Sequence, residues 1–87
     1  MQADKKQIPN RLATIEGHLK GIRKMVQADQ SCVDIIKLSC AVERGLEALE
    51  SALREGHLAS CVPDGFKEGR DQEMIRELGQ MFELFRK

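Results

Sequence analysis

The longest regular pattern in the chain is CVDIIKLSCAVERGLEALESALREGHLASC, residues 32–61. Its apolar residues recur every three or four positions and no proline occurs before Pro63, so the stretch predicts one long amphipathic helix. Ser31 stands at the expected N-cap, with Asp34 three residues later as an acidic variant of the capping box. The apolar stripe consists of Ile35, Leu38, Val42, Leu46, Leu49, Leu53 and Gly56. Such a helix is roughly 45 Å long, so part of its apolar surface is expected to face another subunit.

A shorter amphipathic helix is expected on each side of this stretch. The first covers about 5–28, where Ile8, Leu12, Ile15, Leu19, Ile22 and Val26 alternate by four and three residues. The last covers about 68–85 and carries Ile75, Leu78, Phe82 and Phe85 on one side. Pro63-Asp64-Gly65 is predicted to form the turn that precedes it. With no strand pattern, the chain is expected to be one all-α domain, 1–87, with three helices that assemble into an antiparallel helical bundle.

Length and composition exclude several classes of protein. With 87 residues, 41% of them hydrophobic, and 14 basic against 14 acidic side chains, the chain is core-forming and not disordered. The first residues contain no apolar signal region, and no stretch approaches the roughly 18 apolar residues of a membrane span. Three cysteines form no disulfide pattern and are expected to be reduced thiols. A cytoplasmic protein without membrane contact is therefore expected.

Charge is segregated along the chain although its total is zero. Residues 1–28 contain the bases Lys5, Lys6, Arg11, Lys20, Arg23 and Lys24 against the acids Asp4 and Glu16, which is six minus two, or +4. Residues 29–69 contain four bases and eight acids, or −4. A basic first helix, multiplied by assembly, fits the phosphates of nucleic acid, and a merely solvated face is the alternative. No aromatic residues interleave with the bases, which argues against stacking of single-stranded bases.

Cys32, His57 and Cys61 offer two thiols and an imidazole, the donor atoms of soft metal sites. In one helix, the 25 residues from Cys32 to His57 span roughly 38 Å, so the three side chains cannot meet within one subunit. His57 and Cys61 are four residues apart and share a face. A site that uses all three must therefore take Cys32 from an antiparallel partner. The alternative is that the cysteines are small core residues, which is the expectation for Cys40.

A family resemblance is carried by RLATIEGHLKGI (11–22), Met25, CVDI (32–35), Ala41-Val42 and HLASC (57–61). These blocks closely resemble the copper-sensitive operon repressor (CsoR) family, from about Arg11 to Cys61 and more loosely through the last helix. The resemblance implies a transcriptional repressor that binds double-stranded operator DNA and releases it when its ligand binds. It also implies a homodimer with an antiparallel four-helix core, paired as a dimer of dimers into a homotetramer.

The copper-sensing branch of this family implies the ligand set. In it, Cu(I) is held by Cys32 from one subunit and by His57 and Cys61 from the partner, and Glu77, outside the ligand set itself, accepts a hydrogen bond from the histidine ring. Thiolates and imidazole suit Cu(I), whereas Zn(II) generally requires a fourth ligand. The chain departs from the branch at Ser31, where copper sensors often have a tyrosine.

The resemblance also implies DNA contacts. Arg11 matches a family position that contacts DNA. An arginine that some members use in the second helix falls on Ala48, so Arg44 or Arg54 would have to replace it. Together with the basic first helix, the expected DNA-binding residues are Arg11, Lys20, Arg23, Lys24, Arg44 and Arg54.

Two other functions are compatible with these residues. A persulfide-sensing repressor would bridge Cys32 and Cys61 by sulfur atoms, but such members typically lack the histidine, so His57 favours copper. A helical copper carrier without DNA binding would explain the thiols and leave the basic helix unused. Enzymatic activity is not expected, because no nucleophile stands with a base and an orienting third group.

Overall fold

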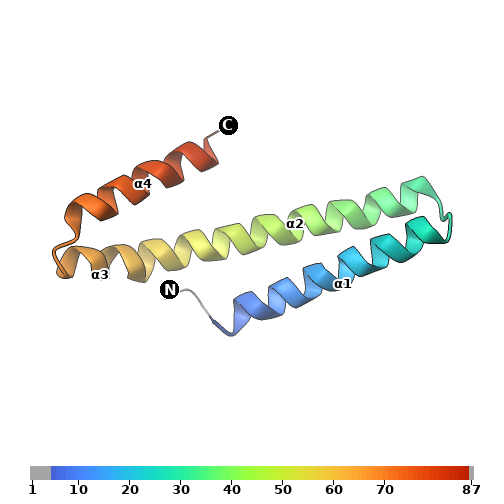
Figure 1. Ribbon diagram of the computed structural model, residues 1–87, viewed down its shortest axis with the longest axis horizontal. Coiled ribbons are helices and arrows are strands. Elements are labelled where there is room, and N and C mark those ends of the chain that lie inside the picture. The colour runs from blue at the N-terminus through green and yellow to red at the C-terminus, as the bar shows by residue number, and fades with distance from the viewer. Residues whose placement is uncertain (1–4, 87) are drawn as a thin grey trace.

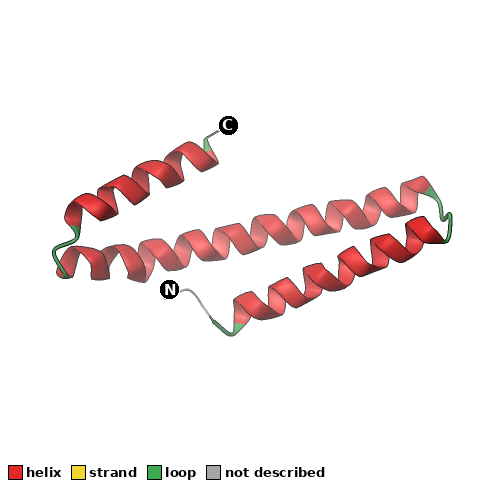
Figure 2. Ribbon diagram, viewed as in Figure 1, coloured by secondary structure: helices red, strands yellow, loops and turns green. Residues whose placement is uncertain are grey.

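The protein is all-α, as predicted, in a computed structural model that describes residues 5–86 (Figure 2). Its elements are α1 (Gln7–Gln27), α2 (Cys32–Gly56), the π-helical turn η1 (His57–Cys61), α3 (Val62–Lys67) and α4 (Asp71–Phe85). Because α2, η1 and α3 follow one another without a break, they form one long rod, residues 32–67. The chain therefore has the three helical segments that the sequence predicts.

The three segments lie side by side in a flat arrangement. Figure 1 shows α1 running back along one side of the rod and α4 lying on its other side. The molecule measures 56 × 30 × 14 Å, so it is about one helix thick. Its radius of gyration is 17.4 Å, whereas a compact chain of this length would have about 12 Å. Such a layer has two broad faces and little interior.

The small core lies between α1 and α2. Ile15, Val42 and Leu49 are buried there, and Ile8, Ile22 and Leu53 pack against them partly buried. Two glycines let the helices approach closely. A Cβ atom at Gly45 would lie 3.2 Å from Cγ1 of Ile15, and one at Gly21 would lie 3.3 Å from Cδ2 of Leu38. These positions agree with the amphipathic stripes of the sequence.

The predicted turn at Pro63-Asp64-Gly65 is wrong, because these residues lie inside α3. Proline has no N–H to donate to the carbonyl four residues earlier, and its ring clashes with that carbonyl in a regular helix. Here the helix widens just before the proline. The N–H of Val62 donates to the carbonyl of His57, five residues back, so the rod passes through one π-helical turn instead of ending.

The turn between α1 and α2 and the turn between α3 and α4 share one backbone motif. At the end of α3, Arg70 N–H donates to the Gly65 carbonyl at 2.8 Å and Gly69 N–H to the Phe66 carbonyl at 3.1 Å, with Gly69 at φ 77°. This is the Schellman arrangement, in which glycine adopts the left-handed conformation at low cost. The turn after α1 repeats it with Asp29 at φ 54°.

Ser31 does occupy the N-cap position of α2, as predicted, but its side chain makes no capping hydrogen bond. The bond across this boundary is a backbone one, from the N–H of Ile35 to the carbonyl of Ser31 at 3.1 Å. Ser31 therefore marks the start of the helix by its extended backbone and not by its hydroxyl.

Much of the apolar surface stays exposed in the single chain. Large apolar side chains that are at least half exposed are Leu19, Val26, Val33, Ile36, Ile75, Phe82 and Leu84. Exposed apolar side chains that gather in one patch mark an interaction site. Within residues 5–86, no helix combines the length and hydropathy that crossing a membrane requires.

Candidate metal centre

The π-helical turn places two of the predicted ligands together. His57 and Cys61 are its first and last residues, and both line one cleft between the rod and α4. Ser60 supports the turn, because its hydroxyl donates to the carbonyl of Gly56 at 2.7 Å. Such turns inside α-helices are rare and occur frequently at functional sites. The residue that forces the turn, Pro63, stands two positions beyond Cys61.

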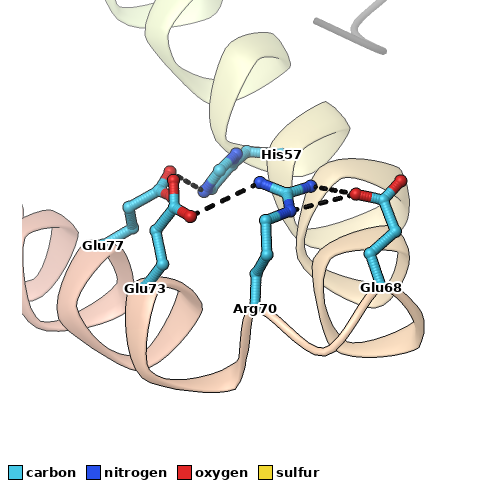
Figure 3. Close-up of polar contacts among 5 residues, drawn as sticks. All are labelled: His57, Glu68, Arg70, Glu73 and Glu77. Carbon is cyan, nitrogen blue, oxygen red and sulfur yellow. Dashed lines mark hydrogen bonds and ion pairs between the residues drawn. The ribbon is translucent and has the colours of Figure 1, made fainter.

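His57 lies opposite Glu77 of α4 (Figure 3). Its Nε2 atom is 3.4 Å from Oε1 of Glu77, and the two side chains are 24% and 32% exposed. A carboxylate on one ring nitrogen orients an imidazole and leaves the other nitrogen, Nδ1, available to a metal ion. The structure thus brings together the histidine and the glutamate that the family resemblance pairs.

The start of α4 is braced against α3. Arg70 lies between Glu68 and Glu73 (Figure 3). Its Nη2 atom is 2.8 Å from Oε2 of Glu68, and its Nη1 atom is 3.7 Å from Oε2 of Glu73. The hydrogen bond to Glu68, and then the charge of Glu68, raise the pKa of Arg70 above its usual value. Met74, in the first turn of α4, is 2% exposed and packs directly on Gly65 of α3. The packing of Met74 on Gly65 anchors the first turn of α4, about one turn before Glu77.

The cleft that contains His57 and Cys61 has a volume of about 370 Å³ and is lined mostly by apolar groups of α2 and α4. Arg54 and Phe85 form its other end, where the Arg54 guanidinium carbon lies 4.3 Å from the centre of the Phe85 ring. The sequence did not predict this contact. Only the apolar stripe of the last helix pointed to Phe85, and nothing in the sequence pointed to its partner.

Cys32 is the first residue of α2, far along the rod from the cleft, and it is exposed. In the described part of the chain, no three His, Cys, Asp or Glu side chains are close enough together to hold a metal ion. The donor types nevertheless fit a soft metal ion, since one imidazole and one thiol face the same cleft. A single subunit therefore presents two of the predicted ligands together and the third at the other end. Cys40, expected in the core, is half-buried.

The predicted DNA-binding residues fall into different environments. Lys20, Arg23 and Lys24 are exposed and lie within one turn of α1, and Arg44 is exposed on α2. Arg11 is half-buried, and its Nε atom is buried without a hydrogen-bond partner among residues 5–86. Arg54 is turned into the cleft against Phe85. Of the predicted DNA-binding residues, three of the four that are exposed therefore lie on α1.

Comparison with known proteins gives consistent matches over most of the chain. The family model of the metal-sensitive transcriptional repressors matches residues 4–85. The copper-sensing transcriptional repressor CsoR of Bacillus subtilis (strain 168) is 40% identical over 84 residues, which is 97% of this chain and 83% of that protein. CsoR of Mycobacterium bovis (strain BCG / Pasteur 1173P2) is 37% identical over 78 residues, 90% of this chain and 66% of that protein.

A solved structure has the same fold. The crystal structure of the copper-sensing repressor CsoR with Cu(I) from Geobacillus thermodenitrificans NG80-2 superposes with a TM-score of 0.87 at 31% sequence identity. The match covers 100% of this chain and 94% of that one. The three helical segments and their arrangement are therefore those of a known repressor fold.

Proposed function

The chain belongs to the family of metal-sensitive transcriptional repressors, and from this premise we propose that it binds operator DNA, senses Cu(I) and releases the DNA when the ion binds. The family is one of transcriptional regulators and not of enzymes. Its similar members in Bacillus and Mycobacterium are named for copper sensing. Because we propose that it binds operator DNA, we also propose that the protein is cytoplasmic.

The proposed site joins Cys32 of one subunit to His57 and Cys61 of its partner. The observation that carries it is the split arrangement of the donors. His57 and Cys61 face one cleft, with Glu77 3.4 Å from the imidazole, whereas Cys32 stands exposed at the far end of the rod. An antiparallel partner rod brings the two ends together. Two thiolates and an imidazole are suitable ligands for Cu(I), which would cross-link the subunits there.

The flat shape supports assembly into a dimer. A layer 14 Å thick leaves the apolar stripes of α1 and α2 without cover, and Leu19, Val26 and Ile36 are each more than half exposed. We propose that α1 and α2 of two subunits form an antiparallel four-helix bundle, and that two such dimers form a homotetramer. Complete burial of a fully exposed Leu or Ile contributes about 1.5–3 kcal/mol, and covering a half-exposed one contributes part of that. Assembly therefore adds stability that the small core of one subunit lacks.

The DNA-binding surface is proposed on α1. Lys20, Arg23 and Lys24 are exposed on one stretch of that helix, and residues 1–28 carry a net charge of +4 by sequence. Arg11 and Arg44 complete the proposed surface. Contacts of this kind neutralise phosphates and release counterions, which gives affinity that falls steeply with salt. Binding to duplex DNA is therefore expected to be strongest at low ionic strength.

The link between the two sites runs through α4. Bound Cu(I) ties the end of one rod to the η1 turn of the other, and Glu77 transmits any displacement of His57 to α4. The tetramer then favours a shape whose basic helices no longer match the duplex. Linkage requires the reciprocal effect, so operator DNA weakens Cu(I) binding, by a coupling of about 1–3 kcal/mol in typical cases.

The experiment that tests this function is an anaerobic Cu(I) titration against a competing chelator, with and without the operator duplex. The chain has no Trp or Tyr, so thiolate-to-copper absorption in the ultraviolet stands out. We expect Cys32→Ser, His57→Ala and Cys61→Ser to abolish tight binding and DNA release, and Cys40→Ser to retain both. Equal Cu(I) affinity of the free and DNA-bound protein would exclude the proposed sensing.

The same variants separate the two other candidates. If persulfide is the inducer, His57→Ala keeps its response to sulfane sulfur while Cys32→Ser and Cys61→Ser lose it. If the protein is a copper carrier, it binds Cu(I) and shows no specific DNA binding at moderate salt. The position of His57 opposite Glu77 favours the copper sensor.

A further inference from the structure

The helix α4 packs closely on the rod at α3, but alongside α2 and η1 it lies across a gap that side chains bridge. No Cα atom of α4 lies within 8 Å of a Cα atom of α2 or η1. Within residues 5–86, one ion pair and one cation–π contact cross the cleft between them: the His57–Glu77 pair and the stacking of Arg54 on Phe85. The position of the Glu77 carboxylate is therefore set by the ends of α4 and not by close backbone packing along it.

Arg54 is held by the ring and not by a carboxylate. Its guanidinium carbon lies 4.3 Å from the centre of the Phe85 ring, well inside the 6 Å range of cation–π attraction. Glu47 and Glu50 line a neighbouring pocket together with Arg54, yet within residues 5–86 no carboxylate oxygen lies within 4.0 Å of an Arg54 nitrogen. The half-buried cation thus rests on the ring of Phe85.

The two contacts are spaced so that they fix the direction of α4. Glu77 and Phe85 are eight residues apart, or about 12 Å along the helix. At its start, α4 is anchored by Met74 on Gly65. An anchor at the start alone lets the helix swing about the turn at 68–70, whereas a second anchor at Phe85, its last residue, prevents that swing.

We propose that Arg54 and Phe85 are a positioning pair, which holds the end of α4 so that Glu77 stays opposite His57 and thereby raises Cu(I) affinity. This inference rests on the proposed function. It also gives Arg54 a role other than the DNA contact that the family resemblance implies. The pair acts only through Glu77, so its effect on the metal site disappears when the Glu77 carboxylate is removed.

Copper affinity tests the pair directly. Arg54→Gln removes the cation and Phe85→Leu removes the ring while keeping an apolar side chain. Each is expected to weaken Cu(I) binding about three- to tenfold, the range for a partly desolvated cation–π contact, and the double variant no further than the larger single effect. Phe85→Trp keeps a ring and is expected to retain the wild-type affinity.

A second cycle distinguishes positioning from a general loss of structure. Adding Arg54→Gln to Glu77→Gln is expected to cause no further loss of Cu(I) affinity, because the carboxylate that the pair positions is already absent. Phe82→Leu is the matched control, since Phe82 is on the same helix and 79% exposed. Additive losses in either cycle, unchanged affinity in both single variants, or an equal loss in Phe82→Leu would overturn the proposal.

Amide hydrogen exchange of the metal-free protein tests the pair without copper. Arg54→Gln and Phe85→Leu are expected to accelerate exchange in the second half of α4, and Phe82→Leu is not. If the wild type fails to bind Cu(I), the proposed function fails, and this measurement still decides whether the pair holds α4. Wild-type exchange rates in both variants would refute it.

Discussion

The Nε2 atom of His57 lies 3.4 Å from Oε1 of Glu77 and links the π-helical turn of the rod to α4. The link spans a cleft in which the two backbones stay more than 8 Å apart between Cα atoms. In the proposed mechanism, it is the point at which a change at the metal ligands reaches the last helix.

Replacing Glu77 by Gln is predicted to weaken Cu(I) binding about 10- to 100-fold, because loss of a partner that orients a ligating histidine has effects of this size. The amide keeps the shape and removes the charge that the imidazole faces. Chelator competition measures the affinity. Glu73→Gln is the control, since Glu73 lies one turn earlier on α4 and pairs with Arg70 instead. Equal losses in the two variants would contradict the role assigned to Glu77.

Replacing Gly65 by Ala is predicted to lower the free energy of unfolding by about 1–3 kcal/mol, the usual range for overpacking. A Cβ atom there would lie 2.6 Å from Cγ of Met74, which is almost fully buried, so the Met74 side chain would have to shift inside a packed site. Denaturant unfolding measures the change.

Gly79→Ala is the matched control for Gly65→Ala. No heavy atom lies within 4 Å of a Cβ at Gly79, so the alanine is predicted to be neutral or to stabilise α4 by up to about 1 kcal/mol. If Gly65→Ala is as stable as Gly79→Ala, Met74 does not anchor α4 in the way described.

Periodicity predicted the helical part of the fold well, and for a physical reason. The apolar stripes in residues 7–27 and 32–56 bury Ile15, Val42 and Leu49 against each other. The residues that produce the helical period in the sequence are therefore the same ones that pack in the core. The sequence predicts a turn at Pro63 because proline usually ends a helix. In the structure, the helix continues through Pro63 because the preceding turn, His57–Cys61, widens to a π-helix. No local propensity of these residues indicates such a turn.

At the candidate site, one contact between helices was predicted and another was not. The pairing of His57 with Glu77 was expected from family resemblance, and the structure places the two side chains 3.4 Å apart. Arg54 is predicted as a DNA contact because it could replace an arginine that some family members use, and the structure turns it toward Phe85, 31 positions later in the chain. Contacts between helices far apart in sequence depend on how α4 folds back, and the sequence pattern does not specify that angle.

Neutralising the bases of α1 is predicted to weaken operator binding and to flatten its salt dependence. For each phosphate that Lys20→Gln or Arg23→Gln leaves without its cation, the slope of log affinity against log salt falls in magnitude by about 0.9. Fluorescence anisotropy at several salt concentrations measures the slope. Lys67→Gln, an exposed change on α3, is expected to leave it unaltered. A slope unchanged in all three variants would move the DNA-binding surface away from α1.

The central claim is that each copper site is shared between two subunits, and mixing two inactive variants tests it most directly. Cys32→Ser and the double variant His57→Ala/Cys61→Ser are each predicted to bind no Cu(I) tightly. After unfolding and joint refolding, half of the randomly paired dimers contain one intact site out of two. The mixture is therefore predicted to recover about a quarter of the wild-type copper stoichiometry. No recovery in dimers shown to contain both chains would contradict the shared site.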